Sequence, residues 1–239
     1  MSIQQNLIAG VCIAIGIASS GLAVKAGIDH FVDRDRVVTV KGLAERTVDA
    51  DYVIWPVTFR VSGNDLTSLY QRAQAQSDEI REYLVSQGIK AEDISLGTPN
   101  VSDLHADFYG ANLPPERYRV IGTVSVATSD VATVRKAMVN QTDLLQKGVL
   151  VQESYRTQFS FNGLNAIKPE MIEEATKNAR ASAQKFAEDS DSTLGKIRRA
   201  SQGQFVIYDR DSNTPYIKRV RVVTTCLLYT SPSPRDGLL

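Results

Sequence analysis

The fold of this chain follows from the stretch Phe159–Asp189, FSFNGLNAIKPEMIEEATKNARASAQKFAED. An alternating segment ends there in an Asn162-Gly163 turn, and a long helical pattern follows it. Lys168-Pro169 predicts where the helix begins, because proline in the first turn loses no hydrogen bond within the helix. Small and apolar side chains then form one stripe: Met171, Ile172, Ala175, Ala179, Ser182, Ala183, Phe186 and Ala187. Such a narrow stripe predicts a helix that lies close against a sheet.

Strand and helix patterns alternate through the rest of the chain. Alternation and β-branched residues predict strands at Val37–Lys41, Asp51–Ser62, Ile94–Asp103, Tyr118–Thr128, Val149–Phe161, Ile197–Tyr208 and Ile217–Thr225. A period near 3.6 predicts a helix at Leu66–Gln87, capped by Asn64 or Asp65 and closed by Gly88. The apolar stripe of this helix contains Leu66, Leu69, Tyr70, Ala73, Ser77, Ile80 and Leu84. Pro56 cannot donate to a ladder and predicts an edge or a bulge.

The order of these elements indicates an internal duplication. Strand, long helix, strand, polar loop and strand occur in residues 37–128 and again in residues 149–225, linked by a helix at residues 129–142. We therefore predict an α+β protein of two βαββ-type units, with mainly antiparallel sheets and long helices on one face. We expect exposed sheet edges, protected by Pro56, by charges or by pairing with other subunits.

An uncharged run precedes this body at Leu7–Val24. It is about 27 Å long as a helix, close to the hydrocarbon thickness of a bilayer. We predict one N-terminal transmembrane helix in residues 1–28, followed by a spacer in residues 29–36. The alternative is a secretory signal that is removed, although the run exceeds the usual apolar core of such a signal. Mixed charges after Val24 leave the orientation open.

The other end of the chain breaks from the pattern. From Cys226 it reads CLLYTSPSPRDGLL, which resembles a translated sequencing adapter. We expect residues 226–239 to be a non-native tail; a genuine Ser/Pro-rich tail is the alternative. Cys12 is the only other cysteine, so the sequence excludes a disulfide framework within the body and a zinc site built from cysteine pairs.

Charge and motif composition argue against several classes of function. Lys and Arg balance Asp and Glu at 27 each. The basic residues Lys196, Arg198 and Arg199, and later Lys218, Arg219 and Arg221, lack interleaved aromatic residues, so we expect no nucleic-acid partner. No glycine-rich phosphate loop or serine-nucleophile elbow occurs. We predict no catalytic residue, no bound cofactor and no enzyme activity.

One cluster has metal-like spacing. Asp103, His105 and Asp107 would share one face if their segment were extended, and carboxylate and imidazole groups are metal ligands. A second imidazole or a thiolate is missing, and the segment has the composition of a polar loop. These three residues are weak candidates, and we expect a solvated loop in preference to a metal site.

Several blocks of sequence resemble the bacterial SIMPL-domain family. They are Val40–Val57, Phe159–Arg180, Leu194–Phe205 and Ile217–Thr225, and the resemblance covers residues 37–225. It implies an α+β fold, a periplasmic or secreted protein often anchored by one N-terminal helix, and a tendency to form oligomers. It also implies a loose link to envelope or oxidative stress, and it supplies no catalytic motif. In that family the last strand normally continues beyond the position of Thr225.

Together these features predict a non-catalytic interaction or structural protein of the cell envelope. We expect a single-pass inner-membrane protein with its body in the periplasm, or a secreted periplasmic protein if the signal is cleaved. We expect a homo-oligomer; its protein or envelope partner is not identified by the sequence. The alternatives are a metal-dependent, stress-protective enzyme and a ring-forming, channel-like or chaperone-like assembly.

Overall fold

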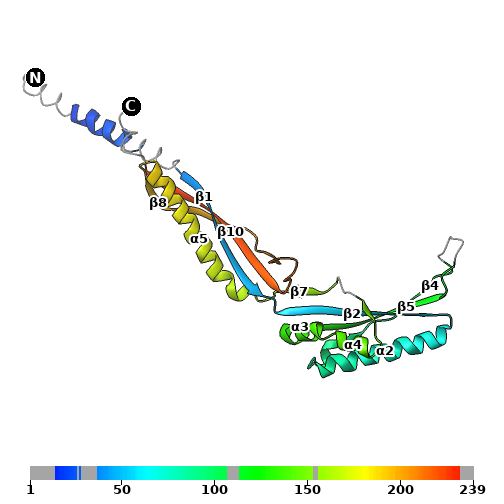
Figure 1. Ribbon diagram of the computed structural model, residues 1–239. Helices are drawn as coiled ribbons and strands as arrows, with labels where there is room; N and C mark the ends of the chain where they lie inside the picture. The colour runs from blue at the N-terminus through cyan, green and yellow to red at the C-terminus, as the bar shows by residue number, and fades with distance from the viewer. Residues whose placement is uncertain (1–13, 26, 28–36, 107–112, 153–155, 232–239) are drawn as a thin grey trace, which may run out of the picture. The chain divides into compact units, whose positions relative to one another are not determined.

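The computed structural model describes residues 14–25, 27, 37–106, 113–152 and 156–231 (Figure 1). It is an α+β protein with antiparallel sheets, as predicted. The chain separates into two compact units. Unit 1 takes residues 1–46, 167–206 and 221–239, and unit 2 takes residues 47–166 and 207–220. Both units are therefore discontinuous in sequence, whereas the predicted duplication divided the chain into consecutive halves.

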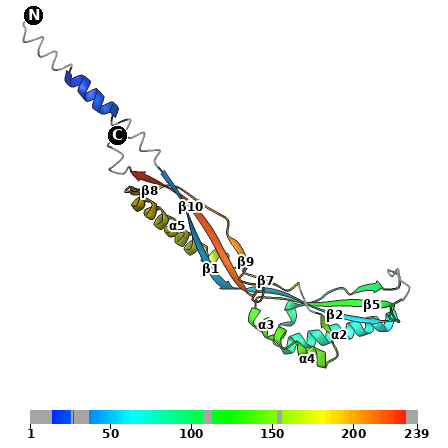
Figure 2. The ribbon, with the colours of Figure 1, turned by 45° about the horizontal axis from the view of Figure 1, so that its top comes forward.

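Unit 2 contains a six-stranded antiparallel sheet. Its strands are β2 (Tyr52–Gly63), β3 (Ile94–Leu96), β4 (Asn100–Asp103), β5 (Tyr118–Thr128), β6 (Val151–Gln152) and β7 (Gln158–Ser160). The order is β3-β5-β2-β6, with β4 also paired to β5 and β7 also paired to β2. The helices α2 (Leu66–Ser86), α3 (Val131–Val139) and α4 (Thr142–Gln146) lie on one side of this sheet (Figures 1 and 2), and a 3-10 turn occupies Ala91–Asp93.

Local signals position α2. The Asp65 carboxylate accepts the Ser68 N–H at 3.0 Å and so satisfies one of the free amides of the first turn. Gly88 follows the helix with φ of +94°, a conformation that glycine adopts without strain. Both predicted helix signals are confirmed. In the predicted stripe Leu69, Ala73, Ile80 and Leu84 are buried, and the prediction is wrong for Leu66 and Tyr70, which are exposed.

The core of unit 2 lies between α2 and the sheet. The alternation predicted for Tyr118–Thr128 is confirmed, since Val120, Val124 and Val126 are fully buried and their neighbours are partly exposed. Trp55 is 3% exposed and belongs to this core, as its apolar bulk requires. Pro56 is opposite Ser125 of β5, and among the described residues its other side faces the gap between β7 and β6. The missing N–H thus costs no ladder bond there.

Unit 1 is built around β1 (Val37–Asp49), β10 (Ile217–Ser231), β8 (Thr193–Gln202) and α5 (Leu164–Asp189), with the strands in the order β1-β10-β8. The strand β9 (Val206–Asp209) also pairs with β10. The buried stripe of α5 consists of Met171, Ala175, Ala179, Ala183 and Ala187. Its small residues meet Gly42 of β1: a Cβ at Gly42 would lie 1.9 Å from the Ala175 carbonyl oxygen. Helix and strand are therefore in backbone contact, as the narrow stripe predicted.

Several predicted boundaries are wrong. The helix α5 begins at Leu164, before Lys168-Pro169, and Phe186 of its predicted stripe is 60% exposed. In the predicted strand Val149–Phe161 the described residues form β6 and β7, and residues 153–155 lie outside the described part. The predicted strand Ile94–Asp103 divides into β3 and β4. The second predicted helix divides into α3 and α4, and the segment Ile197–Tyr208 divides between β8 and β9.

The early start of α5 has a non-local cause. The Asp51 carboxylate accepts the N–H of Asn162 at 2.8 Å and the N–H of Gly163 at 2.8 Å. A carboxylate at this place satisfies free amides just before the helix and adds negative charge at its positive end. Asp51 is far from the helix in sequence, so the local pattern could not reveal this cap.

The last strand also departs from prediction. We expected it to end at Thr225, but β10 continues to Ser231 and pairs with β8 beyond Cys226. Cys226 and Leu228 are fully buried against Ala179 and Ala183 of α5. Cys226 therefore has a packing role here. Residues 232–239 lie outside the described residues.

Residues 14–25 of the predicted transmembrane run are helical, and residues 7–13 lie outside the described part. Within the described residues, no helix has both the length and the apolar character that crossing a membrane requires.

Candidate functional site

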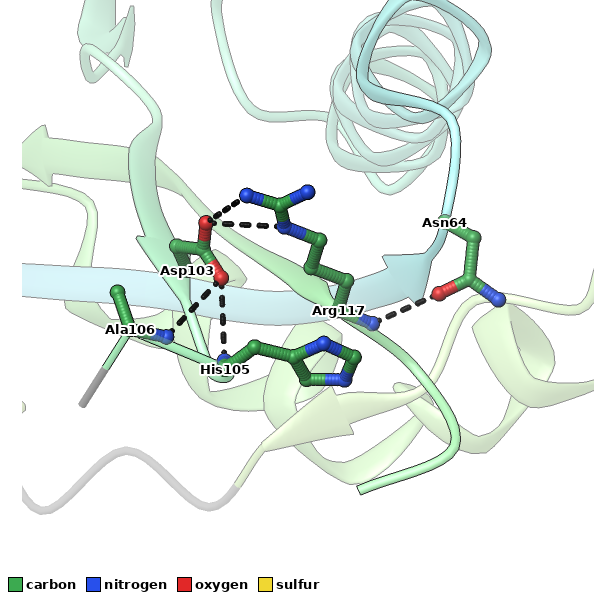
Figure 3. A network of polar contacts seen from close by, with 5 residues as sticks. All are labelled: Asn64, Asp103, His105, Ala106 and Arg117. Carbon is green, nitrogen blue, oxygen red and sulfur yellow. Dashed lines mark hydrogen bonds and ion pairs between the residues drawn. The ribbon is translucent and has the colours of Figure 1, made fainter. Parts of the chain in front are cut away.

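Asp103 and His105 of the predicted metal cluster lie at the end of the β4–β5 pair, where the chain leaves β4 at Asp103. One oxygen of the Asp103 carboxylate, Oδ1, accepts the N–H groups of His105 at 3.0 Å and Ala106 at 3.3 Å. The other, Oδ2, accepts Nε of Arg117 at 3.0 Å and a second guanidinium nitrogen at 2.9 Å (Figure 3). Both oxygens of this carboxylate are thus used to hold the turn and Arg117.

Arg117 is fixed from a second direction as well. Its backbone N–H donates to Oδ1 of Asn64 at 2.8 Å, which ties the start of α2 to the start of β5 (Figure 3). Its guanidinium also lies 5.0 Å from the ring centroid of Tyr118. The hydrogen bonds from Arg117, and then those from the two amides, hold the pKa of Asp103 below its usual value despite some desolvation. The carboxylate is therefore ionised at neutral pH.

The His105 side chain does not point toward the Asp103 carboxylate. Its ring lies away from the Asp103 carboxylate (Figure 3), and Nε2 is 2.8 Å from the carbonyl oxygen of Pro114. Because a carbonyl can only accept, this contact places the proton on Nε2. Asp107 lies outside the described residues, and the described residues contain no group of three or more His, Cys, Asp or Glu side chains that could hold a metal ion. Asp103 and His105 are structural in this turn.

An apolar hollow of about 580 Å³ lies on the same face of β4. Leu66 and Tyr70 of α2, Val101 of β4 and Val120 of β5 line it, together with two polar residues of α2. Leu66, Tyr70 and Val101 are each close to half exposed. The sequence pattern placed Leu66 and Tyr70 on the buried stripe of α2, but both are exposed at this hollow. An exposed apolar cluster of this kind fits binding.

A second, more polar hollow of about 370 Å³ lies at the other end of β5, next to the start of α3. Its carboxylate Asp130 accepts the Thr133 N–H at 3.0 Å and the Thr133 hydroxyl at 2.6 Å. These hydrogen bonds lower the pKa of Asp130. Asp130 is thus an N-cap, so this acid too is engaged in structure.

Comparison with protein families decides the classification. The family model SIMPL, described as a protein of unknown function (DUF541), matches residues 38–224. The chain belongs to the SIMPL family. The match spans strands and helices of both units of this SIMPL protein and confirms the resemblance seen in the sequence. No curated protein matches the chain. Membership therefore supports an α+β protein of the SIMPL type and assigns no reaction to it.

Proposed function

We propose that this SIMPL protein is a membrane-anchored, oligomeric interaction or structural protein of the cell envelope that binds its partner without transforming it. The run Leu7–Val24 supports the anchor by its length and lack of charge. The proposal places the body in the periplasm and includes a role in oxidative or envelope stress tolerance, on the strength of the family resemblance.

The observation that carries the proposal is the open edge of β8. This strand is terminal in the order β1-β10-β8, and residues 196–202 are all exposed. No described strand pairs with its outer edge. A long edge of unpaired N–H and C=O groups is a ready template for another chain. Val206, in the neighbouring β9, is 53% exposed and adds apolar surface.

The state of the acidic side chains supports binding over catalysis. Asp103 is paired with Arg117, and Asp130 caps α3. A general acid or base needs a proton that it can exchange with a substrate, with a pKa near the working pH. Both of these carboxyl groups have pKa values below the usual value. The apolar hollow beside Asp103 is the kind of surface that holds a partner's side chain.

The test is the mass of the full chain in detergent, measured by light scattering together with elemental analysis of the same sample. We expect a discrete oligomer without stoichiometric metal. The variant Ile197→Lys adds a charge to the β8 edge and should shift the mass toward the monomer. Val139→Lys, at an exposed site on α3, is the matched control and should leave the mass unchanged. A monomer carrying one metal per chain, lost on His105→Ala, would overturn the proposal.

A further inference from the structure

The sheet of unit 2 has a second face, opposite the helices. Alternate residues of β2 and β5 point to it, and the described helices of this unit lie on the other side (Figures 1 and 2). The register aligns its side chains in rows across the strands. Thr58 is opposite Thr123, and their hydroxyl oxygens are 3.4 Å apart. Most of the described positions on this face carry hydroxyl or amide side chains.

Two arginines lie among these rows. Arg60 pairs with Ile121, and Asn100 of β4 is on the far side of Ile121. Arg119 pairs with Ser62 on one side and Ser102 on the other. Arg60 and Arg119 are therefore diagonal neighbours, about 7–8 Å apart at the backbone in an antiparallel pair. Like charges so placed repel each other.

Among the described residues, no acidic side chain balances the two arginines on this face. Every outward-facing position of the described strands in this sheet is occupied by a residue other than Asp or Glu. With its amide oxygen turned toward the guanidinium, Gln152 accepts Arg60 Nε at 3.2 Å, and this contact is neutral. The Nε of Arg119 is buried and has no hydrogen-bond partner among the described residues. Arg119 as a whole is only partly buried, so the rest of its guanidinium is open to an anionic acceptor from outside the chain.

The chemistry of the face selects among anionic partners. A protein interface would present a core of aromatic and apolar residues. Around the two arginines the described positions instead carry Ser, Thr, Asn and Gln side chains beside Ile121, whereas Tyr52, Ile54, Pro56 and Ala127 lie toward the other end of the face. Nucleic acid carries one charge at each phosphate, and two arginines are too sparse to follow such a chain. A chain of sugars with spaced carboxylates offers many hydroxyls and few charges. Its hydroxyls match the polar rows of the face, and its carboxylates match the two arginines. The planar guanidinium is suited to bidentate contact with a carboxylate.

We propose that the open face of the unit 2 sheet binds an acidic polysaccharide, with Arg60 and Arg119 taking its carboxylates and the neighbouring Thr, Ser and Asn side chains taking its hydroxyls. The inference rests on the proposed function, since it names the partner of an envelope interaction protein. A glycan laid across β4, β5 and β2 contacts side chains alone, so it requires no free strand edge.

The experiment measures binding of a hyaluronan hexamer, in which only every second sugar carries a carboxylate, to the full chain in detergent by isothermal titration calorimetry. We expect binding that falls about tenfold or more in Arg60→Gln/Arg119→Gln, because charge-assisted hydrogen bonds are lost. Arg81→Gln, on the exposed side of α2, is the matched control and should bind as the parent does. The methyl ester of the hexamer has the same hydroxyls without the charge, and its binding should be weaker by a similar factor.

A second variant protects the test against misfolding. Thr58→Val/Thr123→Val keeps the shape of both side chains and removes only the hydroxyls, so it should lower the affinity for the hexamer severalfold. The proposal is overturned by a parent protein that does not bind the hexamer, or by an equal loss in Arg81→Gln. Equal binding of a glutamate hexapeptide would overturn the sugar assignment. If the protein is an oligomer but does not bind the hexamer, only this inference is refuted. If it is a monomer that binds the hexamer, only the oligomer of the proposed function is refuted.

Discussion

The closest approach of helix and strand in unit 1 gives a sharp prediction about Gly42. Adding a methyl group in Gly42→Ala would place Cβ 1.9 Å from the Ala175 carbonyl oxygen, 2.4 Å from the Ala179 nitrogen and 2.8 Å from the Ala179 Cβ. Two of these three atoms belong to the backbone, so no rotamer change can relieve the clash. Strand and helix must separate by about an ångström before the contact is tolerable.

The cost follows from that separation. Overpacking a well-packed core typically costs about 1–3 kcal/mol, and a gap of 0.5–1 Å forfeits roughly a quarter to a half of each contact's attraction. The whole buried stripe of α5 would move away from β1 together with Ala175 and Ala179. We therefore expect Gly42→Ala to lower the free energy of unfolding of unit 1 by about 3 kcal/mol, at the upper end of that range. Opening of unit 1 should then become more than a hundredfold more frequent, at about tenfold for each 1.4 kcal/mol.

Cys226 provides the assay, since its thiol is fully buried in the same cluster as Ala179. In a Cys12→Ser background it is the only cysteine, and native-state thiol labelling then reports the opening of unit 1. Burial also raises the pKa of the Cys226 thiol, which keeps labelling of the closed state slow. We expect labelling to accelerate about a hundredfold in Gly42→Ala.

Two controls make the prediction refutable. In Gly63→Ala the new Cβ would lie 3.6 Å from Leu69 Cδ1, an ordinary contact, so the labelling rate should not change. Adding Ala179→Gly to Gly42→Ala removes the 2.8 Å contact and leaves the one at 1.9 Å, so it should not rescue the protein. A labelling rate in Gly42→Ala within about threefold of the parent would show that α5 and β1 are not in backbone contact.

Three further predictions concern single polar groups. The Tyr83 hydroxyl donates at 2.7 Å to a buried carbonyl, and its pKa is raised to about 12, chiefly by burial. Its contribution to stability is therefore complete below about pH 10 and lost as pH rises through 12; alkaline absorbance titration should show one late tyrosine, absent in Tyr83→Phe. Asp51→Ala should destabilise the start of α5 by about 1–2 kcal/mol in urea unfolding, whereas Asp49→Ala, at the exposed end of β1, should not. The pKa of Asp103 is lowered, so its hydrogen bond to Arg117 should be complete above the usual carboxyl pKa and should be lost as pH falls through the lowered value. Nuclear magnetic resonance of the Arg117 side chain can follow this loss.

Features with local causes were predictable from the sequence. The helix α2 has a side-chain cap at Asp65 and a glycine at its end, so its boundaries needed no knowledge of the rest of the fold. The strand β5 has one buried and one wet face, and strict alternation predicted its bounds. The narrow stripe of α5 likewise predicted close packing, because only small residues permit backbone contact.

Features with distant causes were not predictable. The alternation of Val149–Phe161 indicates one strand, yet its two ends pair with separate parts of β2 as β6 and β7. The strand that would have opened the second repeat is thus used in the sheet of unit 2, and β1 takes part in the sheet that α5 covers. Periodicity shows which face of a strand is buried, and it carries no information about which partner buries it.

The candidate metal cluster shows the same limit for chemistry. The spacing of Asp103 and His105 predicts a shared face only in an extended chain, but β4 ends at Asp103, and the following amides bind its carboxylate. The cation that completes the arrangement is Arg117, which β5 brings back beside β4. A carboxylate with four donors already in place has little capacity left for a metal ion. The same two strands present Ser102 and Arg119 on their opposite face, where no acid is present among the described positions. The charge of Asp103 is paired on one face of these strands, whereas the charge of Arg119 is unbalanced on the other, so we expect a ligand to bind the open face of the sheet.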